Sequence, residues 1–147
     1  MRKDLEDMFV DGQFKLMDGD IEDSIGIFCS IIEKEPGLSQ VHQALSIAYL
    51  KLNNLDAALN EINSAILCEP QNPRFIYRKS AILFQKGDVE DALDSINQAI
   101  DINPGFPAAY VLRSKIFEKM GDEERASSDI SHASMLNKAS SSKLVDW

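Results

Sequence analysis

The sequence predicts an all-α protein built from four copies of a helix pair. Three observations carry this prediction. Several residue types recur along the chain at intervals of 34 residues, and apolar residues keep helical spacing between the breaks. Gly or Asn, and then Pro, stand at fixed places in the copies, where they would end helices. Because each short helix pair must bury its apolar side against a neighbour, the repetition indicates an α-solenoid.

The recurrence holds in several registers through most of the four copies. They are Pro36, Pro70 and Pro104; Gly19, Asn53, Gly87 and Gly121; Ser24, Ala58, Ala92 and Ala126; Phe28, Ile62, Ile96 and Ile130; Ile31, Ala65, Ala99 and Ala133; and Gly12, Ser46, Ser80 and Ser114. The predicted repeats are about 5–38, 39–72, 73–106 and 107–140, within a single domain of residues 1–147.

Within a copy, the first helix is expected in segments 39–52, 73–86 and 107–120, and the second in the segments that follow. In copies three and four Gly-Asp separates the two: Gly tolerates the left-handed conformation that ends a helix, and Asp caps the amides that open the next. Proline stops the second helix, because its nitrogen cannot donate a hydrogen bond. Small residues in the Ser46 register let the paired helices approach closely.

Residues 141–147 are expected to form either a C-terminal cap or a tail. As a cap, Leu144, Val145 and Trp147 would cover the flank of the last repeat, which otherwise leaves an apolar face in water.

Composition excludes several classes of protein. Apolar residues make up 44% and charged residues 27%, which is ordinary for a globular domain. The net charge of −9 predicts repulsion from nucleic acid and from anionic membranes. No apolar stretch is long enough to span a bilayer, and two cysteines make no disulfide framework, so a cytoplasmic or nuclear location is expected.

The repeated pattern resembles the tetratricopeptide repeat (TPR) family. The residues that match are His42, Leu45, Ser46, Tyr49, Ala58, Ile62 and Pro70 in the second copy and Ile76, Lys79, Ser80, Leu83, Ala92, Ile96 and Pro104 in the third. The fourth copy matches with Lys138 in place of Pro, and the first copy diverges most. The resemblance implies a right-handed superhelical α-solenoid, in which first helices line a concave groove and second helices form the convex back.

Charge is segregated between the two kinds of segment. In copies two to four the first-helix segments hold eight basic residues and one acid, whereas the following segments hold twelve acids and one base. Helix dipoles explain part of this, because Lys51, Lys86 and Lys119 lie near C-terminal ends of helices. The cations that remain are Arg74, Arg78, Lys79, Arg113 and Lys115.

Registers that the resemblance places in the groove give a candidate peptide-binding set. It comprises Gln13, Gln43, Lys51, Arg74, Tyr77, Arg78, Phe84, Lys115 and Lys119. Arg binds carboxylates bidentately, and Arg74 and Arg78 share a helix face at i, i+4. The expected partner is therefore a protein or peptide with an acidic segment or a C-terminal carboxylate. Packing between repeats is the alternative role for Tyr77 and Phe84.

The expected function is a protein-interaction adaptor or scaffold, not an enzyme, with no cofactor and no metal. Arg74 and Arg78 match two of the five registers of the carboxylate clamp in chaperone adaptors, whereas Phe9, Gln13 and Ala44 do not match. The alternative is a structural subunit of a larger or self-associating assembly. Local similarity makes this alternative cochaperone-like or ubiquitin-ligase-scaffold-like. Partner identity and oligomeric state stay open.

Overall fold

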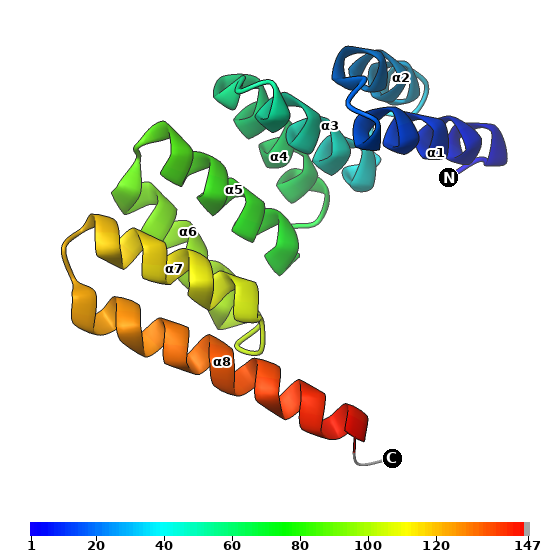
Figure 1. Ribbon diagram of the computed structural model, residues 1–147. Coiled ribbons are helices and arrows are strands. Elements are labelled where there is room, and N and C mark those ends of the chain that lie inside the picture. Colours follow the sequence, from blue (N-terminus) through cyan, green and yellow to red (C-terminus); the bar gives the residue numbers. More distant parts are fainter. Residues whose placement is uncertain (146–147) are drawn as a thin grey trace. The chain divides into compact units, whose positions relative to one another are not determined.

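The described part of the chain holds eight helices and no strand (Figure 1). The structure is a computed structural model that describes the backbone of residues 1–145 and the side chains of residues 1–140. The helices are α1 (Lys3–Met17), α2 (Ile21–Lys34), α3 (Ser39–Lys51), α4 (Leu55–Cys68), α5 (Pro73–Lys86), α6 (Val89–Ile102), α7 (Pro107–Lys119) and α8 (Glu123–Val145). The prediction of an all-α fold made of helix pairs is confirmed.

The helices form two compact units, Met1–Gln71 and Asn72–Trp147. Unit 1 holds α1 to α4 and unit 2 holds α5 to α8, so each contains two of the predicted repeats. Within each unit, every helix packs on the next one along the chain. The two first helices of a unit also touch, α1 with α3 and α5 with α7. The single-domain organisation stays a prediction.

The turns inside the helix pairs follow the predicted repeat. Gly19, Gly87 and Gly121 have φ angles of 88°, 90° and 82°, and Asn53 in the same register has 58°. These are left-handed conformations. Residues that carry a Cβ adopt them at a cost, because the Cβ comes too close to the carbonyl oxygen. Turn residues 34 positions apart therefore share the left-handed backbone conformation as well as a type of residue.

The predicted Asp caps are only partly present. Asp122 Oδ1 accepts from the Arg125 amide at 3.1 Å, as expected. Asp88 makes no side-chain cap hydrogen bond, so its predicted role is wrong. The first turn of α6 instead carries the acids Glu90 and Asp91. The positive end of the helix dipole stabilises these charges without a capping hydrogen bond.

Small residues at the predicted registers do bring the paired helices together. The Ser46 hydroxyl donates to the Ala58 carbonyl at 3.0 Å, and the Ser80 hydroxyl donates to the Ala92 carbonyl at 2.7 Å. Gly12 is buried, and a Cβ on it would lie 2.5 Å from Cε1 of the fully buried Phe28. A larger side chain at this register would push the two helices apart.

The C-terminal segment differs from the earlier repeats. Helices α2, α4 and α6 end within two residues of Pro36, Pro70 and Pro104, whereas α8 continues to Val145. Lys138 in the proline register keeps an amide donor, so the helix does not stop there. The predicted repeat end at 140 is thus passed by a continuous helix. The proposed cap side chains at 144–147 lie outside the described residues.

The turn register gives a first prediction. Asn53→Gly should raise the free energy of unfolding by up to about 1 kcal/mol, and Asn53→Ala should lower it by about 1 kcal/mol, because only the left-handed conformation fits. Urea unfolding followed by far-UV circular dichroism measures both. Equal stability of the Ala variant and the wild type would contradict the prediction.

Candidate functional site

The nine predicted binding residues are divided between the two units. Gln13 on α1 and Gln43 and Lys51 on α3 belong to unit 1. The other six belong to unit 2: Arg74, Tyr77, Arg78 and Phe84 on α5, and Lys115 and Lys119 on α7. The structure therefore brings six of them to one pair of touching helices. The contribution of the three in unit 1 stays a prediction.

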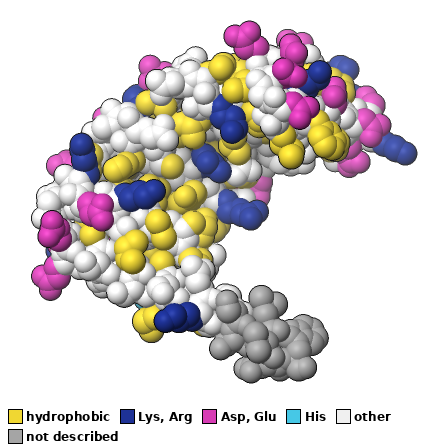
Figure 2. All heavy atoms as spheres, in the orientation of Figure 1, with side chains coloured by type: hydrophobic (Ala, Val, Ile, Leu, Met, Phe, Trp, Pro, Cys, Tyr) yellow, Lys and Arg dark blue, Asp and Glu magenta, His cyan; other side chains and the backbone are white. Residues whose placement is uncertain are grey.

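The candidate surface in unit 2 is called the α5–α7 surface and consists of Arg74, Arg78, Lys115 and Lys119 with the neighbouring apolar side chains. Arg74, Lys115 and Lys119 are exposed, and Arg78 is half-buried. Figure 2 shows Lys and Arg side chains set among hydrophobic ones over α5 and α7. Such a mixture suits a peptide that carries both carboxylate and apolar groups.

Arg78 has an unusual environment within this surface. Its Nε atom is buried, and no hydrogen-bond acceptor reaches it in the described structure. A buried guanidinium N–H without an acceptor is costly, and a bound carboxylate would remove that cost. Among the described residues, neither Arg74 nor Arg78 nor Lys115 takes part in a salt bridge.

The aromatic candidates are positioned by packing. The Tyr77 ring lies 5.2 Å from the ring of Phe106, which precedes α7, and both residues are half-buried. Phe84 is also half-buried. The contact with Phe106 supports the packing role for Tyr77 that the sequence left open. An aromatic side chain held in this way still offers its remaining surface to a ligand.

Arg113 is held in contacts within unit 2 and does not contribute a free cation to the α5–α7 surface. Its guanidinium donates to both carboxylate oxygens of Asp129 on α8, at 2.9 and 2.8 Å, and to Asn97 Oδ1 at 3.1 Å. The hydrogen bond to Asp129 raises the pKa of Arg113, against the desolvation that lowers it. Part of the charge on first and second helices therefore pairs within the fold. Arg113 is not one of the cations available to a ligand.

Groups that could carry chemistry are also tied into the fold. His42 binds Glu61 Oε2 through Nδ1 at 2.8 Å and the Pro36 carbonyl through Nε2 at 2.9 Å. Burial raises the pKa of the Cys29 thiol, and Glu61 and Glu33 raise it further, which disfavours the nucleophilic thiolate. Residues 1–140 contain no group of three or more side chains placed to hold a metal ion.

The structural matches fit this arrangement of paired helices. A crystal structure of MamA has a TM-score of 0.85 at 18% identity, with 94% of this chain and 81% of that chain covered. "MamA 41-end from Desulfovibrio magneticus RS-1" has a TM-score of 0.83 at 15% identity, with 92% and 76% covered. At these identities the matches show the fold. A comparison with curated proteins gives no significant match.

The helix pairs and the structural matches together define an α-helical repeat protein. Residues 73–106 match the family model described as tetratricopeptide repeat, over the limits predicted for the third copy. The third copy is therefore a tetratricopeptide repeat, as the resemblance implied. Within the described residues, no helix is both long and apolar enough to cross a membrane.

Sequence reasoning missed an exposed apolar group on α1. Val10, Phe14 and Met17 are 48%, 59% and 79% exposed. The register gives no signal for this exposure, because Ala48, Ile82 and Ile116, the equivalents of Phe14 in the other repeats, are all buried.

The Arg113–Asp129 pair gives a second prediction. Asp129→Ala should lower the free energy of unfolding by about 2–4 kcal/mol, because it leaves a half-buried guanidinium without its carboxylate. The double variant Arg113→Met/Asp129→Leu should lose clearly less, since neither charge stays unpaired. Urea unfolding measures both. A double variant as unstable as Asp129→Ala would show that packing, and not the ion pair, determines the cost.

Proposed function

We propose that the chain is a non-enzymatic protein-interaction scaffold that binds an acidic or C-terminal peptide segment on the α5–α7 surface. Binding would be an equilibrium without a covalent step. Arg74 and Arg78 would hold the carboxylates, and Lys115 and Lys119 would attract the acidic segment from α7. Gln13, Gln43 and Lys51 belong to unit 1, and their part in peptide binding stays a prediction.

The observation that carries this proposal is the buried Nε of Arg78, which has no acceptor within the described structure. Arg113 is the instructive contrast, because it lies on the neighbouring first helix and has both carboxylate oxygens of Asp129 as partners. Arg113 is thus satisfied internally, whereas the guanidinium of the half-buried Arg78 keeps unused hydrogen-bonding capacity, which supports a role in binding an external acid.

The register of the two arginines supports a peptide ligand. Arg74 and Arg78 are one helical turn apart, so their guanidinium groups lie on the same face of α5. Two neighbouring guanidinium groups fit two neighbouring carboxylates. These are either the side chain and the α-carboxylate of an acidic C-terminal residue, or the side chains of two adjacent acidic residues. The exposed lysines on α7 add long-range attraction, which raises the association rate more than the affinity.

The third prediction concerns the two arginines. Arg74→Ala/Arg78→Ala should weaken binding of an acidic peptide by about 2–5 kcal/mol if the contacts are buried. Fluorescence anisotropy would be measured with three labelled peptides: one rich in Asp and Glu with a free C-terminus, the same peptide amidated, and a basic peptide of equal length. Loss of affinity on amidation would assign the arginines to a C-terminal carboxylate, and no loss would assign them to acidic side chains.

A matched control removes the same charge elsewhere. Lys34→Ala/Lys138→Ala takes two exposed cations from α2 and α8 and should leave the affinity nearly unchanged. An arginine double variant that is folded by circular dichroism and binds as tightly as the wild type would overturn the proposed site. So would an equal loss of affinity in the control variant.

A further inference from the structure

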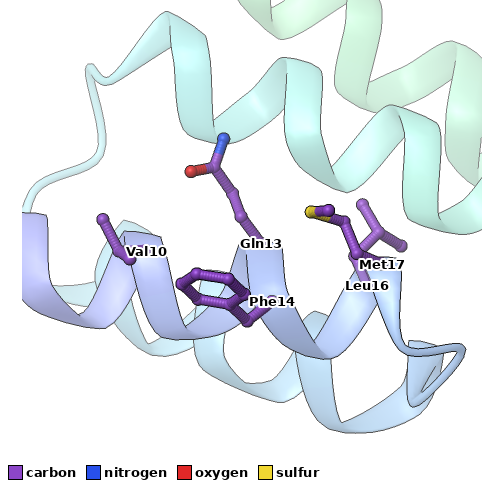
Figure 3. A pocket seen from close by; sticks show the side chains of 5 residues that line it. All are labelled: Val10, Gln13, Phe14, Leu16 and Met17. Atoms are coloured by element: carbon purple, nitrogen blue, oxygen red, sulfur yellow. The ribbon is translucent and has the colours of Figure 1, made fainter.

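The outer face of α1 carries apolar side chains that no part of unit 1 covers. Val10, Phe14 and Met17 follow one another along one side of the helix, and with Gln13 and Leu16 they line a hollow (Figure 3). The opposite side of α1 packs on unit 1 through Leu5, Met8 and Phe9. The helix is therefore apolar on two sides, whereas a surface helix needs only one such side.

Comparison between repeats shows what this outer face is equivalent to. Phe14 shares its register with Ala48, Ile82 and Ile116, which are all 0% exposed. In repeats two and four, the first helix is covered by the second helix of the preceding repeat, α2 on α3 and α6 on α7. The outer face of α1 corresponds by register to this stacking surface. Phe14 keeps an apolar side chain there, whereas Asp7 stands in the register of Val41, Phe75 and Ala109, which are buried.

Met17 departs from its register in the same direction. Its equivalents are Lys51, Gln85 and Lys119, which are polar and exposed. A methionine that is 79% exposed extends the apolar stripe by one helical turn beyond Phe14. Methionine adapts its shape to a partner and is common at binding surfaces.

The other end of the chain is built in the opposite way. Ser127 and Ser134 on α8 are exposed, whereas the earlier repeats have Ile or Leu in both registers. A polar outer face of this kind avoids the exposure of apolar surface to water. Ile130 and Met135 are the exposed apolar exceptions on α8. Repeat four thus presents mainly polar side chains on this face, whereas repeat one combines the exposed apolar residues Val10 and Phe14 with Asp7 and Asp11.

Acidic residues border the apolar stripe of α1. The helix carries four acids and two lysines, and Asp7 and Asp11 lie one turn from Val10 and Phe14 on the same side. Both aspartates are exposed, and neither has an ion-pair partner among residues 1–140. The charge complementary to this face is positive.

This charge pattern disfavours a second copy of the chain as the occupant. Pairing two such faces would bring Asp7 and Asp11 against the same acids, in a chain of net charge −9. The first turns of α2 and α6 are acidic as well. The basic helix α5 has Phe75, Ile82 and Leu83 buried already, and its other aromatic side chains, Tyr77 and Phe84, are half-buried.

We propose that the outer face of α1, made by Asp7, Val10, Asp11, Phe14 and Met17, binds an amphipathic helix of another protein whose apolar stripe is bordered by Lys or Arg. The bound helix lies against α1 as α2 lies against α3 and α6 against α7. Phe14 and its neighbours bury the stripe, and the two aspartates orient the helix and select its charge. This face shares no residue with the α5–α7 surface, and the proposal does not rest on the function assigned there.

The test uses three labelled peptides of about 18 residues, long enough to form a helix. The first has Leu at i, i+4, i+7 and i+11 with Lys on both borders, the second has Glu in place of Lys, and the third has the composition of the first in an order without a stripe. Fluorescence anisotropy should give binding of the first peptide about tenfold tighter than of either other peptide. Equal binding of the first and third peptides would mean that net charge alone attracts them, and would overturn the proposal.

Variants of the chain locate the binding. Phe14→Ser should weaken binding of the Lys-bordered peptide about tenfold, and Asp7→Lys/Asp11→Lys should reverse the preference toward the Glu-bordered peptide. Leu67→Ser is the matched control, because Leu67 on α4 is 82% exposed and lies outside this face. Loss of affinity in the control, or none with Phe14→Ser, would overturn the proposal. So would a dimer, seen by sedimentation equilibrium, that Phe14→Ser abolishes, since it would assign the face to a second copy.

Discussion

The close approach of two helices at one small residue is the contact on which each repeat depends. Gly12 lies against the Phe28 ring, and Ser46 and Ser80 donate hydrogen bonds to carbonyls of the opposite helix. A serine satisfies its hydroxyl on the partner backbone without adding the volume that would separate the helices. Since the left-handed turn residue fixes where the chain reverses, the two constraints together set the register of each pair.

Once the pairs are fixed, each side chain on a first helix has one of three environments: the contact with its own partner helix, the contact with the preceding repeat, or solvent. Arg78 and Arg113 show how far the environment decides the role. Both are cations on first helices of unit 2, yet Arg113 is held by Asp129 and Asn97, and the Nε of Arg78 meets no acceptor. Charge counted along the sequence cannot separate the two cases, because the acid that neutralises Arg113 comes from α8.

The sequence predicted the features that depend on local backbone chemistry and on repetition. Helix pairs, turn positions and the small registers followed from Gly, Pro and the 34-residue interval, since these act within a few residues. The Asp88 cap failed because a cap needs one side-chain rotamer as well as a suitable residue. The six candidate residues on α5 and α7 were predicted as a group by register, but the packing of Tyr77 on Phe106 depends on a contact between segments far apart in the sequence. The apolar outer face of α1 was missed because Val10 and Phe14 look like core residues in sequence.

The exposure of a stacking register explains why that face matters physically. A repeat with a neighbour on both sides buries this register, so the register then carries no information about partners. Where a register of this kind faces water, polar residues avoid the cost of apolar exposure, as Ser127 and Ser134 do on α8. Phe14 keeps an aromatic ring in that position, which costs apolar exposure in the free chain. A covering helix would recover that cost, and the aspartates beside the ring limit which helices can do so.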